Sequence, residues 1–292
     1  MAKGRQLKRR IRSVQNTRKI TRTMELVATS KMKRAQDRVV AARPYAGALA
    51  EVIGDLWSPD LAEQFALLRR PMVPAKGGPT TVALLLVTSN RGLAGAFNAN
   101  LIKEARRRIE ALEAEGYTVA LHCIGKKGAG FFKYLGRTPA ADRSDIGDAP
   151  RIEDAASLID GLIEAYAAGR LAGVEMVQAR FVSALSTPPT LTRLLPVEAP
   201  ARSGPRRDYI LQPDVETILE TLLPIYVRNL VYRGLVETAA AEQAARRTAM
   251  KNATDNAGDI LRLLDRRYNR MRQAQITQEI AEIVGGAAAL EG

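Results

Sequence analysis

A strand–loop–helix junction of the kind that binds phosphate occupies residues 82–105, VALLLVTSNRGLAGAFNANLIKEA. Glycines at such junctions let the backbone approach a phosphate at the start of the helix. Here Gly92 and Gly95 form G-x-x-G, which is neither the G-x-G-x-x-G dinucleotide motif nor a P-loop ending in Gly-Lys-Ser/Thr. The next apolar run ends in HCIGKK, without the carboxylate that would hold a ribose. We therefore interpret the glycines as residues that let the chain turn tightly against a sheet.

Other residues that could do chemistry are sparse. His122 is the only histidine and Cys123 the only cysteine, and both fall in a run that predicts a buried strand. We expect both to be packed in the core, since a reactive thiolate needs an exposed, electropositive setting. A single cysteine also excludes an internal disulfide and fits a reducing compartment. The sequence thus predicts no catalytic residues, no cofactor and no metal site.

The positive charge of the chain is concentrated near its N-terminus. The formal net charge is +13, and residues 1–43 hold 14 Lys or Arg against only Glu25 and Asp37. Such a segment is expected to meet an acidic surface, a nucleic acid or an anionic membrane. No apolar run approaches the roughly 20 residues that span a bilayer, and the N-terminus lacks the apolar core of a secretory signal. We expect a soluble cytoplasmic protein, with a peripheral place on a membrane complex left open.

The elements that must position any site begin with a long helix in residues 1–57, interrupted or bent at Pro44. Its apolar residues recur at alternating spacings of three and four, the rhythm of a left-handed coiled coil. They are Leu7, Ile11, Val14, Ala28, Met32, Ala35, Val39, Ala42, Ala46, Leu49, Ile53 and Leu56. The register is interpreted as failing at three positions, Arg18, Thr21 and Glu25. Three neighbours are expected to carry the apolar face there instead: Ile20, Met24 and Val27.

A second and longer coiled-coil helix is predicted in residues 208–292, with a kink at Pro224. If the two helices pair in antiparallel fashion, the C-terminal one projects past its partner by roughly Met271–Leu290. Between them we expect a linker at 58–80, rich in proline, and an α/β domain at 81–207. The predicted fold is therefore α/β, with a long antiparallel two-helix coiled coil and an inserted Rossmann-like domain built on a βαβ unit.

Three blocks of sequence resemble the γ subunit of the bacterial F-type ATP synthase. They are IRSVQNTRKITRTMELVATSKMKRAQDRVVAARPYA, the loop TSNRGLAGAFNANL, and EQAARRTAMKNATDNAGDIL followed by YNRMRQAQITQEIAEIVGGAAAL. The C-terminal pattern I-T-x-E-x-x-E-x-x-x-G-A is met from Ile276 to Ala287. The loop departs modestly from the family, with Asn90 and Ala94 where many members carry Asp and Cys.

The resemblance implies a mechanical role rather than an active site of its own. In this family the γ subunit is the central shaft, with one copy inside a hexamer of alternating α and β subunits. It rests on the membrane c-ring beside ε, and it couples proton-driven rotation to ATP synthesis at the β sites. The family's contacts with β fall, position by position, on Met24, Arg272, Gln273, Thr277 and Glu279. The implied location is the cytoplasmic face of the cell membrane, with membrane attachment only through the complex.

Two other functions compete with this expectation. The basic N-terminal helix with heptads downstream is similar to a zipper-type nucleic-acid binder, although its apolar seam runs through the basic part itself. A nucleotide-dependent enzyme using loop 88–98 is the second alternative, against which the missing lysine and acidic partner argue. The sequence favours the shaft and no nucleic-acid partner.

Overall fold

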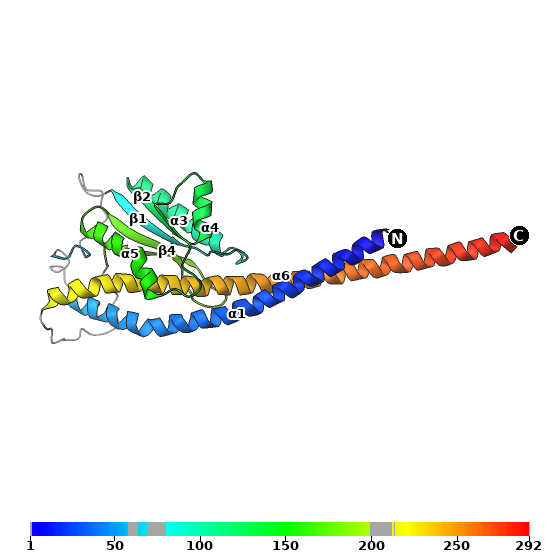
Figure 1. Ribbon diagram of the computed structural model, residues 1–292, viewed down its shortest axis with the longest axis horizontal. Coiled ribbons are helices and arrows are strands. Elements are labelled where there is room, and N and C mark those ends of the chain that lie inside the picture. Colours follow the sequence, from blue (N-terminus) through cyan, green and yellow to red (C-terminus); the bar gives the residue numbers. More distant parts are fainter. Residues whose placement is uncertain (1, 58–63, 69–79, 199–211, 213, 292) are drawn as a thin grey trace. The chain divides into compact units, whose positions relative to one another are not determined.

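The computed structural model describes residues 2–57, 64–68, 80–198, 212 and 214–291 (Figure 1). The expected linker at 58–80 and the expected domain boundary at 207 lie largely outside these residues. The chain divides into two compact units. The first, called the helix-pair unit, consists of Met1–Val27 with Arg247–Gly292, and the second, called the sheet unit, is Ala28–Arg246.

Two long helices contribute to both units. The first, α1, is Ala2–Leu56, and the last, α6, is Val215–Glu291. Pro44 and Pro224 both lie inside these helices. The expectation that Pro44 interrupts the first helix is therefore wrong, since the assignment is continuous through it.

The sheet unit holds a five-stranded sheet of order β3-β2-β1-β4-β5, parallel except for β5, which is antiparallel to β4. The strands are β1 Thr81–Val87, β2 Thr118–Ile124, β3 Ala141–Arg143, β4 Gly173–Ala179 and β5 Pro189–Leu195. The connecting helices are α3 Phe97–Ala114, α4 Lys126–Tyr134 and α5 Ile152–Ala167. The predicted βαβ unit is confirmed as β1-α3-β2. The short strand β3 lies in a segment for which the sequence predicted no strand.

The alternating side chains of β1 divide the core into two layers. Val82, Leu84 and Leu86 pack in one cluster with residues of α3 and α4. Ala83 and Leu85 pack in the other cluster, which includes residues of α5, α6 and α1. Side chains of the terminal helices thus complete the core of the inserted domain.

Within the sheet unit, α6 has neighbours on two sides, the sheet and α1 (Figure 1). Small residues make this possible, because Ala240 and Ala244 pack with Ala35 and Val39 of α1. On the sheet side, a Cβ added to Gly234 would lie 1.7 Å from Oε1 of Gln178 on β4. Glycine at that position therefore allows the helix to approach the strand closely.

Within the helix-pair unit, α1 and α6 run antiparallel. Ile11 of α1 packs with Leu261 and Leu264 of α6, whereas Thr21 contacts Thr254. As the residue number rises along α1, that of its partner falls along α6, so the predicted antiparallel pairing is confirmed for this pair.

The seam of this pair differs from the prediction at two of the three polar positions, Thr21 and Glu25, whereas Arg18 is exposed. Thr21 and Glu25 are buried, whereas Ile20 and Val27 are more than half exposed. The heptad register therefore continues without a break through Thr21 and Glu25, and polar side chains occupy the seam. The interpretation that the register fails there is wrong. The three-and-four spacing continues from Ile11 to Ala28, and it predicts the buried positions better than the apolar character of the neighbouring residues does.

Candidate functional site

Loop 88–98 is held by hydrogen bonds from its own side chains. The Thr88 hydroxyl donates to the carbonyl oxygen of Ile124 (3.1 Å). The amide of Asn90 donates to the carbonyl oxygens of Ser144 and Ile146, both at 3.0 Å. Gly95 lies at φ 58°, a left-handed conformation that glycine adopts readily. These contacts support the interpretation of the loop as a tight turn that ties β1 to β2 and to the segment after β3.

The amide groups at the start of α4, the helix that follows β2, have protein acceptors. The backbone NH of Lys126 donates to Oδ1 of Asn90 (3.0 Å), and that of Gly128 donates to Oγ1 of Thr88 (2.9 Å). The NH of Lys127 donates to the carbonyl oxygen of Ser89 (3.2 Å). A Cβ on Gly125 would lie 2.1 Å from the carbonyl oxygen of Thr88, so the backbone itself fills the space. The start of α4 is therefore bonded to loop 88–98 and offers no free amides to a phosphate.

The two candidate chemical groups on β2 are packed. Cys123 is buried, and desolvation raises the pKa of its thiol to about 12. His122 is half-buried, and burial lowers its pKa. At neutral pH the thiol is protonated and therefore a poor nucleophile. Among the described residues, no group of three or more His, Cys, Asp or Glu could hold a metal ion.

The residues implied to contact β all lie in the helix-pair unit. Arg272, Gln273, Thr277 and Glu279 are exposed on α6, and Met24 is half-buried on α1. Thr21 lies opposite Thr254 in the antiparallel pair, so Met24 lies opposite about residue 251 and is separated from Arg272 by about 21 helical residues, or about 32 Å. The structure therefore groups the four α6 residues and leaves Met24 apart.

The four α6 residues form two neighbouring rows. Residues seven apart return to the same side of a helix, which aligns Arg272 with Glu279. Residues four apart also share a side, which aligns Gln273 with Thr277, and the Thr277 hydroxyl donates to the carbonyl oxygen of Gln273 (3.0 Å). Glu279 accepts a hydrogen bond from the amide of Gln275 (3.0 Å). The arrangement presents a guanidinium, an amide, a hydroxyl and a carboxylate on adjacent rows of an exposed helix.

The segment that carries these residues extends beyond α1. A Cβ on Gly4, near the start of α1, would meet Cε of Met271 at 3.3 Å. The following residues, 272–285, are exposed except for half-buried Gln275 (Figure 1). Four large apolar side chains are among those exposed: Ile276, Ile280, Ile283 and Val284. The predicted overhang from about Met271 is confirmed.

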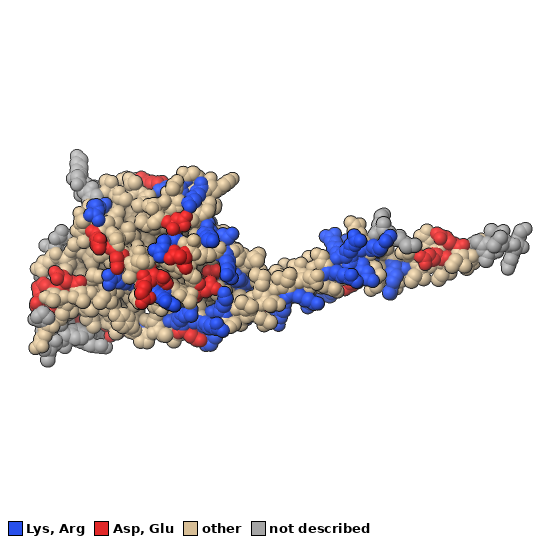
Figure 2. All heavy atoms as spheres, viewed as in Figure 1, with Lys and Arg blue, Asp and Glu red and all other residues tan. Residues whose placement is uncertain are grey.

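Lys and Arg side chains gather on the helix-pair unit, and Figure 2 shows a group of acidic side chains toward the C-terminal end of α6. The sequence correctly placed the basic excess on the N-terminal helix. It missed the basic residues of α6 that lie on the same pair, which are Arg262, Arg266, Arg267 and Arg270. Aligning the two helices in antiparallel register would have shown that the basic residues of α1 and α6 share one surface.

A family model described as ATP synthase matches residues 3–290 of the chain. The ATP synthase gamma chain of Gemmatimonas aurantiaca is 62% identical over 295 residues, with 100% of each chain covered. The chain belongs to the ATP synthase gamma chain family. The gamma chain of Methylococcus capsulatus is 42% identical, over 99% of this chain and 100% of that one. That of Frankia casuarinae is 41% identical, over 98% and 97%.

Solved structures of ATP synthases show the same fold. A chain of the mitochondrial ATP synthase of Euglena gracilis, in rotational state 3, has a TM-score of 0.68 at 19% identity, covering 99% of this chain and 95% of that chain. A chain from the central stalk and c-ring of the Tetrahymena thermophila enzyme has a TM-score of 0.58 at 22% identity, over 80% and 99%. The nucleic-acid alternative is not supported by the family assignment. Across the residues that the structure describes, no helix has an apolar stretch sufficient for a bilayer span.

Proposed function

We propose that this gamma chain is the central rotor shaft of an F-type ATP synthase, which couples rotation of a membrane c-ring to ATP synthesis at β-subunit sites. One observation carries the proposal: α6 continues past the contact of Met271 with Gly4 of α1, and its described residues 272–285 are exposed except for half-buried Gln275. An exposed single helix with large apolar side chains is stabilised when other chains surround it. One copy inside a hexamer of alternating α and β subunits supplies that surrounding.

A shaft acts by differential contact. It changes the equilibrium of a β site only by the difference in its interaction with the open, loose and tight states of that site. The helix-pair unit offers different surfaces on different sides, because exposed Ile20 and Val27 lie on one helix and the polar rows of α6 on another. Rotation of such a surface presents each β subunit in turn with a different contact.

The proposed contacts with β are Arg272, Gln273, Thr277 and Glu279 on α6, and Met24 on α1. Arg272 is exposed, and its planar guanidinium suits a two-point hydrogen bond to a carboxylate that forms and is released. The basic surface of the pair attracts acidic β loops without a unique register, which suits a surface that passes three similar partners. The remaining proposed partners are ε and the c-ring, at the cytoplasmic face of the cell membrane. The Euglena and Tetrahymena chains, described as parts of a rotor and of a central stalk with c-ring, support membership of such a complex.

The experiment is ATP synthesis by the complete complex in sealed vesicles, with Arg272→Ala compared with Arg170→Ala. Arg170 is also exposed, but it lies in the sheet unit and outside the helix pair. Loss of a charged hydrogen bond predicts about a tenfold lower synthesis rate for Arg272→Ala. Arg170→Ala is expected to retain the unmodified rate. Equal rates for the two variants would contradict the assignment of this row to β contact.

A further inference from the structure

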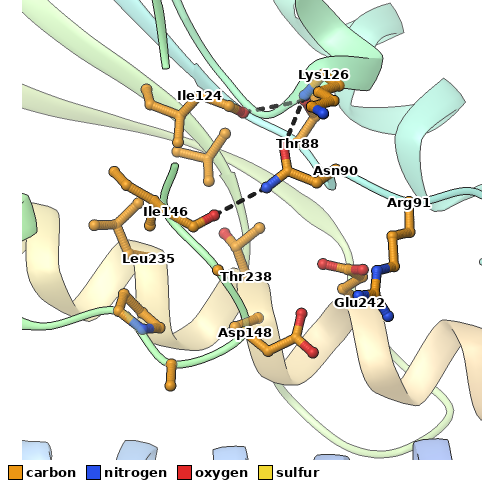
Figure 3. A pocket seen from close by; sticks show the side chains of 15 residues that line it. Thr88, Asn90, Arg91, Ile124, Lys126, Ile146, Asp148, Leu235, Thr238 and Glu242 are labelled. Carbon is orange, nitrogen blue, oxygen red and sulfur yellow. Dashed lines mark hydrogen bonds between the residues drawn. The ribbon is translucent and has the colours of Figure 1, made fainter. Parts of the chain in front are cut away.

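A cavity of about 540 Å³ lies in the sheet unit, at the carboxyl ends of β1 and β2 (Figure 3). It is bounded by Val87 and Thr88 at the end of β1, Ile124 at the end of β2, segment 146–150 and one side of α6. Ligands of open α/β sheets bind beyond the carboxyl ends of the strands, where successive connections leave in opposite directions. In this sheet the point is the end of β1. In the order β3-β2-β1-β4, strand β2 lies on one side of β1 and β4 on the other, so the chain places strands in opposite directions from β1.

The cavity has an apolar part and a charged part. Val87, Ile124, Ile146 and Leu235 supply apolar wall. Figure 3 shows the carboxylates of Asp148 and Glu242, with Arg91 reaching toward Glu242 and Lys126 near Thr88. A volume in the range of a small organic ligand, with apolar walls and a few polar groups, is the usual composition of a binding pocket.

The lining holds two cations and two carboxylates, but each carboxylate pairs with a cation outside the lining. Asp148 already pairs with Lys31 (2.6 Å), and Glu242 pairs with Arg246 (2.5 Å). Both carboxylates are therefore neutralised by cations that do not line the cavity. In the part of the chain that the structure describes, no ion pair is formed by Arg91 or Lys126, and both are exposed. The surplus in the cavity is thus two positive charges.

We propose that this cavity binds a small organic anion, a carboxylate or phosphate monoester with an apolar body. The anionic group lies between Arg91 and Lys126, and the apolar body lies against Val87, Ile124 and Leu235. A longer polyphosphate is excluded, because the first amides of α4 are already bonded to Thr88, Ser89 and Asn90. Such a ligand joins the strand ends, segment 146–150 and α6, which belong to one unit. The site is independent of the proposed β contacts, all of which lie in the other unit.

The test uses phenyl phosphate as the probe, titrated into the isotope-labelled full chain and followed by amide chemical shifts. Two fragments of the probe serve as controls: inorganic phosphate lacks the apolar body, and benzyl alcohol lacks the charge. We expect saturable binding of phenyl phosphate with a Kd on the order of 1 mM, with shifts at Thr88, Asn90 and Thr238. Each fragment is expected to bind at least about tenfold more weakly.

Arg91→Gln with Lys126→Gln removes the two cations, and about tenfold weaker binding of phenyl phosphate is expected. Each single variant is expected to weaken binding by about threefold. Lys103→Gln with Arg170→Gln removes two exposed cations that do not line the cavity, and is expected to leave the Kd unchanged. The proposal is overturned if phenyl phosphate gives no saturation up to about 10 mM, if inorganic phosphate binds equally well, or if the two double variants bind alike.

Discussion

The two segments of α6, one in each unit, have very different surroundings. In the sheet unit, Leu235–Ala244 is buried at every position, because the sheet lies on one side and α1 on another. In the helix-pair unit only about one residue in five of 247–271 is buried, and the described residues 272–285 are exposed except for half-buried Gln275. One continuous helix is thus a core element in the sheet unit and an exposed surface in the helix-pair unit. Stability is expected to come from the first segment and subunit contact from the second.

The largest difference is expected from removing one buried leucine in each segment. Leu223 of the sheet unit is 1% exposed and packs in the larger core cluster, whereas Leu261 of the helix-pair unit is 8% exposed. Leu223→Ala leaves a cavity enclosed on both sides and is expected to cost about 3–5 kcal/mol, whereas Leu261→Ala is expected to cost about 2 kcal/mol. Urea denaturation followed by circular dichroism measures both. Equal costs would show that the two segments are packed alike.

Glycine to alanine at two helical positions sharpens the contrast, because the sign of the effect should change. A Cβ at Gly234 meets Gln178 and Met176 in the core, whereas one at Gly258 has Nε of Arg18 as its nearest atom, at 3.7 Å. Gly234→Ala is expected to destabilise the protein by about 1–3 kcal/mol, and Gly258→Ala to stabilise it by about 0.5–1 kcal/mol. Thermal unfolding of the two variants gives the comparison. Stabilisation by Gly234→Ala would mean that α6 does not approach β4 closely.

The polar layer in the seam of the helix-pair unit predicts a coupling between two threonines. The Thr254 hydroxyl donates to that of Thr21 (2.8 Å), which donates to the carbonyl oxygen of Arg18 (3.1 Å). Thr21→Val and Thr254→Val are each expected to cost about 1 kcal/mol, because each leaves a buried hydroxyl with one partner fewer. The double variant is expected to cost less than the sum, by about 1 kcal/mol. Additive costs in this cycle would argue against a direct bond.

The smallest expected effect concerns His122. Burial lowers its pKa below the ordinary value of 6.5, so the unfolded chain binds a proton more readily than the folded chain. Its contribution to stability is present at pH 7 and above, and it is lost as the pH falls through the unfolded pKa. His122→Gln is therefore expected to flatten the dependence of stability on pH between about 7 and 5, by less than about 1 kcal/mol. An unchanged slope would place the imidazole in contact with water.

The sequence predicted the two long helices, the βαβ unit and the overhang because each depends on local periodicity and on segment length. It failed at Thr21 and Glu25, because the choice between constant spacing and apolar character depends on the partner helix. It also gave no sign of the cavity, whose walls come from β1, β2, segment 146–150 and α6, far apart in the chain. The proposed contact residues on α6 rest only on the family resemblance, because exposed Arg, Gln, Thr and Glu are ordinary on a solvated helix.

The central claim is that the exposed helix pair works as a shaft inside a ring of other subunits. The most direct measurement is to mix the chain with matching α and β subunits, isolate the complex by size, and watch a bead attached to an exposed position of the sheet unit while Mg-ATP is supplied. The account predicts one copy of the chain per three α–β pairs, no hydrolysis by the chain alone, and stepwise rotation of the bead in one direction. A complex that hydrolyses ATP at full rate while the bead stays still would contradict it.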